Sequence, residues 1–226
     1  MTPLLLLLAI LPGLLISWYI YRMDRHEREH RVHLIACFGL GMLLTIPATR
    51  LESWSNLLGI TYPSSLELRL IVSILVVAVW EEAGKFLVLI AYPFSRPFFN
   101  EPIDGIVYAV MIGMGFATLE NIFYASQFGL GTTIIRAFTA VPAHALFSVI
   151  IGYFAGLAWL HPERKARLLL QGLGIAVAFH AVYDFLVLQR YYDWLMILAV
   201  SGLWISIFFA QDLIRRHQDN SPFKPE

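Results

Sequence analysis

Charged residues are scarce in this chain. Asp, Glu, Lys and Arg together make up 14% of its 226 residues, whereas an average soluble domain contains about 25%. Hydrophobic residues make up 58%, and the mean hydropathy is +0.68. This composition excludes an ordinary soluble domain and indicates an integral membrane protein.

Net charge and cysteine are also lacking. Sixteen Lys and Arg residues balance sixteen Asp and Glu residues, so no excess of positive charge points to a nucleic-acid partner. The single cysteine, Cys37, falls within an apolar run, which excludes an intrachain disulfide framework. The sequence also lacks an HExxH zinc motif, a phosphate-binding glycine loop and a nucleophile elbow. Nothing in it indicates an organic cofactor.

Apolar runs dominate what is present. Seven of them approach the roughly 20 residues that a spanning helix needs. They cover residues 3–21, 32–47, 68–92, 103–126, 132–160, 168–188 and 194–214. The first run has no basic start and no small-residue cleavage site, so we predict a retained span and not a signal peptide. Because the connections are short, we predict an all-α bundle that forms one integral-membrane domain over residues 1–226.

The basic residues between these runs fall mainly on one side of the predicted membrane. With the N-terminus outside, the inner segments hold Arg22, Arg25, Arg28, Arg31, Arg96, Arg164, Lys165, Arg167, Arg215, Arg216 and Lys224. The outer segments hold only Arg50, Arg69, Arg136 and Arg190. The positive-inside rule therefore predicts about seven spans, an outside N-terminus and a cytoplasmic C-terminus. Six spans with a peripheral first helix is the alternative.

The stretch WEEAGKF, residues 80–86, places charges within an apolar run. Glu81, Glu82 and Lys85 are costly to bury in hydrocarbon, so they are candidates for function. Glu81 and Lys85 are four residues apart and share one helix face. We therefore expect Lys85 to compensate Glu81, while Glu82 points elsewhere.

Three later runs also carry polar residues. They supply Glu120 and Asn121, then His144, then His180 and Asp184. A rise of about 1.5 Å per residue puts the glutamates and histidines in the outer two-thirds of the membrane, which predicts one shared site between residues 81 and 184. Because His180 and Asp184 are four residues apart, we expect the carboxylate to fix the imidazole tautomer.

Such a set suits the hydrolysis of a peptide bond. That reaction needs a general base, an oxyanion stabiliser and an acid for the leaving amine. Glutamates and histidines can supply these alone, or they can hold a zinc ion that activates water. Two other classes stay open: a proton-coupled transporter, which the lack of an internal repeat disfavours, and a non-catalytic membrane scaffold.

Three motifs resemble the PrsW family of bacterial membrane proteases, which is distantly related to CAAX prenyl proteases and the γ-secretase scaffold subunit. EEAGK at 81–85 is similar to the family's EExxK, FATLEN at 116–121 to its FxxxEN, and HAVYD at 180–184 to its HxxxD. The resemblance covers residues 10–188. It implies a multi-pass protease of the bacterial plasma membrane, which makes the first, site-1 cut on the extracytoplasmic side of an anti-sigma factor. The implied partners are this single-span substrate and the lipid bilayer.

The resemblance also implies roles for individual residues. The implied catalytic residues are Glu81, Glu82, Glu120 and His180, supported by Lys85, Asn121 and Asp184. The candidate zinc ligands are Glu82, Glu120, His144 and His180. Glu120 stands where CAAX proteases carry a histidine, so a metal-free glutamate mechanism stays open beside zinc. A CAAX-protease-like peptidase with another substrate is the nearest alternative function.

Overall fold

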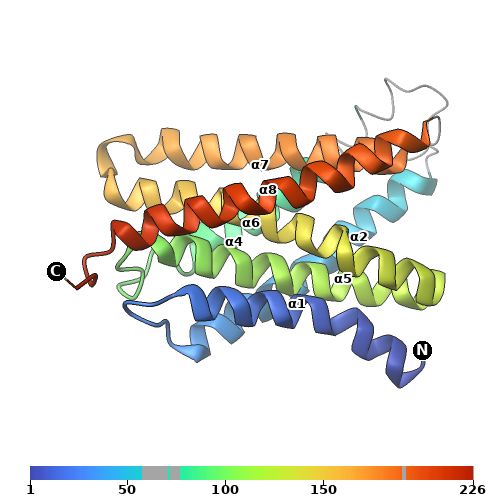
Figure 1. Cartoon of the computed structure of the whole chain (residues 1–226), viewed down its shortest axis with the longest axis horizontal. Coiled ribbons are helices and arrows are strands. Elements are labelled where there is room, and N and C mark those ends of the chain that lie inside the picture. The colour runs from blue at the N-terminus through green and yellow to red at the C-terminus, as the bar shows by residue number, and fades with distance from the viewer. Residues whose placement is uncertain (58–70, 72–76, 190–191, 226) are drawn as a thin grey trace.

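The structure, a computed structural model, describes residues 1–57, 71, 77–189 and 192–225. Within these ranges it is helical and contains no strand, which confirms the predicted all-α class. The α-helices are α1 (Pro3–Met23), α2 (Arg31–Leu57), α4 (Val79–Ala91), α5 (Pro102–Phe138), α6 (Ala140–Leu160), α7 (Lys165–Leu188) and α8 (Asp193–Asp219). Most of them run side by side along the long axis of the molecule (Figure 1).

Among the described residues, five helical stretches are long and apolar enough to cross a membrane. They are Pro3–Met23, Arg31–Leu51, Pro102–Leu160, Pro162–Val187 and Trp194–Asp219. The third stretch contains a break at Gly129, whose φ of 75° lies in the left-handed region that glycine favours. The break falls between the predicted runs 103–126 and 132–160. The predicted run 68–92 lies partly outside the described residues, and its second half contains α4.

The predicted end of the second run at Pro47 is wrong, because α2 continues to Leu57. A proline inside a helix cannot donate a backbone hydrogen bond. Threonines on both sides of it bond to nearby carbonyl oxygens: Thr45 Oγ1 donates to the Phe116 carbonyl at 3.1 Å, and Thr49 Oγ1 donates to the Thr45 carbonyl at 2.9 Å. The bond from Thr45 ties α2 to α5 close to the proline.

The first part of α5 is the centre of the bundle. Every residue from 102 to 118 is buried, and α5 packs against α1, α2 and α6. Small residues permit this close packing, as is common between membrane helices. A Cβ atom on Gly115 would lie 1.9 Å from the Phe38 carbonyl oxygen of α2, and one on Gly113 would lie 1.9 Å from the Ser148 hydroxyl of α6. These two glycines set how closely α2 and α6 approach α5.

Candidate active site

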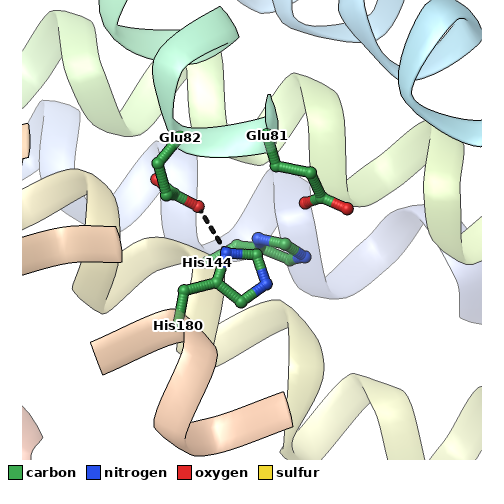
Figure 2. A group of neighbouring side chains, drawn as sticks. All are labelled: Glu81, Glu82, His144 and His180. Atoms are coloured by element: carbon green, nitrogen blue, oxygen red, sulfur yellow. Dashed lines mark hydrogen bonds and ion pairs between the residues drawn. The ribbon is translucent and has the colours of Figure 1, made fainter. Parts of the chain in front are cut away.

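Four predicted site residues from three helices meet inside the bundle. Figure 2 shows the two glutamates of α4 pointing toward a histidine from α6 and another from α7. One ligand atom from each residue lies within 4.8 Å of the others, and the residues are Glu81, Glu82, His144 and His180. The predicted convergence of distant runs on one site is therefore present in the structure.

The ammonium of Lys85 lies in the middle of this group. Its Nζ is 2.8 Å from Glu82 Oε1, 3.5 Å from Glu81 Oε2 and 3.0 Å from His144 Nδ1. It also lies 4.2 Å from the centre of the Phe116 ring. The expectation that Glu82 would point away is wrong, because a lysine can reach carboxylates three and four residues before it on a helix. Lys85 thus forms ion pairs with both glutamates.

His180 is held from both sides of its ring. Its Nδ1 lies 2.8 Å from Glu82 Oε1, and its Nε2 lies 3.3 Å from Asp184 Oδ2. Phe147 stacks on the ring with the centroids 4.7 Å apart. The expected pairing of His180 with Asp184 is therefore seen, and it leaves Nδ1 facing the glutamates.

His144 is oriented in the same way by a different carboxylate. Its Nε2 lies 3.0 Å from Glu120 Oε2, and its Nδ1 faces Lys85. Both histidines therefore direct Nδ1 into the centre and hold Nε2 against a carboxylate. Glu120 itself is not one of the four converging residues, because its carboxylate lies behind His144.

Arg136 was not identified as a site residue by the sequence motifs. Its Nη2 pairs with Glu120 Oε2 at 2.5 Å, and its Nε donates to Asn121 Oδ1 at 3.3 Å. Asn121 in turn donates from Nδ2 to the Ala9 carbonyl of α1 at 3.0 Å. The available signal was Gly129, which lies midway between Glu120 and Arg136 and allows the chain to fold back on itself.

The residues present fit a zinc ion. Two carboxylates and two imidazoles are ligands that zinc commonly takes in proteins, and zinc-bound histidines usually have their second nitrogen hydrogen-bonded to a carboxylate or carbonyl. Glu82 Oε2 is buried and has no hydrogen-bond partner among the described residues, so this oxygen is free to bind an ion. Lys85 contacts three of the four candidate ligands, so an ion bound to all four would displace its ammonium.

Comparison with known proteins relates the chain to a family of membrane proteases. The family described as "PrsW family intramembrane metalloprotease" matches residues 29–210. The chain is 34% identical over 196 residues to "Protease PrsW" of Geobacillus kaustophilus (strain HTA426), covering 85% of each chain. It is 31% identical over 223 residues to "Protease PrsW" of Clostridioides difficile (strain 630), covering 96% of this chain and 92% of the relative.

A third relative is "Protease PrsW" of Bacillus subtilis (strain 168), which is 30% identical over 182 residues and aligned over 79% of this chain and 80% of its own length. No solved structure matches the chain. The family match covers most of the sequence, and the relatives align over most of their length. The chain therefore belongs to the PrsW family of intramembrane metalloproteases.

Proposed function

We propose that Glu81 is the general base that activates water in this intramembrane protease. Its one hydrogen-bond partner among the described residues is Lys85, at 3.5 Å, and 10% of its side chain is exposed. Glu82 is fully buried and is bonded to both Lys85 and His180. Glu81 thus has fewer polar contacts than Glu82 and is the partly exposed carboxylate of the pair.

The neighbouring residues take complementary roles in this proposal. In the metal-free form of the site, His180, held by Asp184, donates the proton that the leaving amine needs. Glu120 orients His144 from behind, and Arg136 with Asn121 holds Glu120 in place. The observation that carries the proposal is the shared orientation of the two histidines, because both direct Nδ1 into the centre of the site, His180 at Glu82 and His144 at Lys85.

Three of the converging residues are enough to hold a catalytic zinc ion. Such sites use three protein ligands and keep one position for water, and Glu82, His144 and His180 would be those ligands. When bound, zinc lowers the pKa of its water toward about 7 and polarises the carbonyl. Glu81 then stays free to accept the proton. The metal-free alternative keeps Lys85 at the centre as the positive group near the developing oxyanion.

The substrate and topology are further parts of the proposal. The motif resemblance supports a site-1 cut in a single-span anti-sigma factor on the extracytoplasmic side. The distribution of Lys and Arg supports seven spans with the N-terminus outside, of which α4 would form the inner half of the third. The short connections support one helical domain over the whole chain.

The test is cleavage of a candidate anti-sigma factor by the purified protein in detergent. We expect Glu82→Gln and His180→Ala each to lower the rate at least 100-fold while expression and melting temperature stay close to the wild type. Glu163→Gln is the matched control, because that side chain is 62% exposed in the turn before α7. Exhaustive chelation should stop cleavage and zinc should restore it. Wild-type rates in both site variants would overturn the proposal.

A further inference from the structure

An apolar groove lies beside the candidate active site, between α2 and α4. Its volume is about 350 Å³. One wall is a stripe of α2 with helical spacing, formed by Leu44, Pro47, Ala48 and Leu51. The other wall is α4, where Gly84 has no side chain to fill the space. The two helices therefore leave an open channel where bundled helices normally interdigitate.

The groove ends on the catalytic group. Among the described lining residues Glu81 alone is charged, and Phe116 lines the groove while also contacting the Lys85 ammonium. At its edge on α4, Trp80 is 60% exposed and Leu87 is 64% exposed. On a spanning helix, such exposed apolar side chains face lipid. The groove thus connects the lipid-facing surface to the proposed general base.

The size of the groove restricts what can enter it. A helix with its side chains is about 10–12 Å wide, so one 5.4 Å turn occupies roughly 400 Å³ or more. The groove cannot enclose such a turn. A few residues of extended chain do fit, because the volume lies in the range of small-ligand pockets, roughly 300–1,000 Å³. Proteolysis also requires an extended segment, since the peptide groups of a spanning helix are bonded within the helix.

We propose that this groove binds an unwound, apolar segment of a membrane-spanning substrate and accepts the side chain of a residue flanking the cleaved bond. This inference rests on the proposed proteolytic function. The groove favours an apolar side chain because its described lining is apolar apart from Glu81. Glu81 lies at the end of the groove, where the proposed mechanism requires it to act on the peptide bond. The missing side chain at Gly84 leaves room for a residue as large as leucine.

Gly84→Leu tests the groove directly. A Cβ atom at this position would lie 3.5 Å from the flexible end of Leu44, which is an ordinary contact, so the added atoms enter the groove. Gly39→Leu is the matched control: Gly39 is on another face of α2 and has no neighbour within 4 Å of an added Cβ. Both variants add the same atoms to a helix of this pair.

The substrate is a single-span membrane protein in which the two residues flanking the cleaved bond are both leucine or both alanine. We expect Gly84→Leu to lower the ratio of leucine-substrate to alanine-substrate cleavage rates at least tenfold, because small changes in an apolar pocket alter discrimination by about 10- to 200-fold. Gly39→Leu should keep the wild-type ratio. An unchanged ratio in Gly84→Leu would overturn the groove as a specificity site.

A binding measurement separates this inference from the proposed function. A photoreactive residue in place of Ala48 should cross-link to the leucine substrate in a Glu81→Gln background, whereas one in place of Gly39 should not. Cross-linking at residue 48 without any cleavage by the wild type would support the groove and contradict the proposed cleavage of this substrate. Cleavage with no cross-linking at residue 48 would reject the groove and leave the protease proposal standing.

Discussion

At the residue scale, the two histidines are arranged alike although they lie on different helices. His144 directs Nε2 at Glu120, and His180 directs Nε2 at Asp184. Carboxylates in this position fix the tautomer and raise the basicity of the opposite nitrogen, and their loss typically lowers metal affinity or activity 10- to 100-fold. The chemistry of the site therefore depends on residues that do not touch its centre.

The first prediction concerns Asp184, which holds His180. We expect Asp184→Asn to weaken zinc binding and to slow cleavage, each about 10- to 100-fold. The reason is that an uncharged amide replaces the carboxylate that accepts the hydrogen bond from the imidazole and fixes its tautomer. Zinc affinity by competition with a chelator and the cleavage rate are the two measurements. Asp212→Asn, a change at a half-exposed side chain of α8, should alter neither. Unchanged zinc affinity in Asp184→Asn would contradict the positioning role.

The second prediction concerns Lys85, which occupies the centre of the ligand group. We expect Lys85→Met to bind zinc at least tenfold more tightly, because a buried ammonium about 3 Å from the ligands repels a dication and competes for the same donors. Equilibrium dialysis against a zinc buffer measures this affinity. Weaker zinc binding in Lys85→Met would show that the lysine supports the ligands, and would contradict the proposed competition between the ammonium and the ion.

At the element scale, the position of each site residue depends on close helix contacts along α5. The third prediction is that Gly115→Ala destabilises the protein by about 1–3 kcal/mol, since the new Cβ would lie 1.9 Å from a backbone oxygen of α2. Thermal unfolding in detergent measures the effect. Gly39→Ala adds the same methyl group to open space and should leave the melting temperature unchanged or slightly higher. Equal melting temperatures for the two variants would contradict the packing argument.

The sequence predicted the elements better than it predicted side-chain directions. Apolar length was enough to place most helices, and the polar residues within apolar runs identified the converging glutamates and histidines. The prediction that Glu82 points away from Lys85 was wrong. Helical spacing does not show that a long lysine side chain can contact carboxylates three and four residues before it. Arg136 was counted as a loop residue, because its contact with Glu120 exists only after the chain reverses.

At the scale of the whole molecule, buried acids also gather near the opposite end of α5 from Glu120. Asp24 and Glu101 are fully buried, and Glu29 is 4% exposed. Asp24 Oδ2 accepts from the Glu29 backbone N–H at 3.1 Å. Burial, with the nearby charges of Glu101 and Glu29, raises the pKa of Asp24 to about 7. This carboxyl is therefore uncharged in the folded protein under mildly acidic conditions.

The fourth prediction follows from the sign of that shift. Between pH 4 and pH 7 the folded state binds the Asp24 proton and the unfolded state has lost it, so stability falls as pH rises through this window. Asp24→Asn keeps the shape without the charge, and we expect it to raise the melting temperature at pH 8 more than at pH 5. Asp212→Asn, on the half-exposed side chain, should show no such difference. A larger gain at pH 5 than at pH 8 for Asp24→Asn would contradict the assignment.

In the proposed mechanism, the bundle brings the Glu81 carboxylate against a centre built from three helices. The most direct measurement is the cleavage rate and zinc content of purified Glu81→Gln beside those of the wild type. We predict that Glu81→Gln loses at least 1,000-fold in rate, because the general base is gone, while its zinc content stays within about twofold of the wild type, because Glu82, His144 and His180 remain. Cleavage at the wild-type rate by Glu81→Gln would contradict the account.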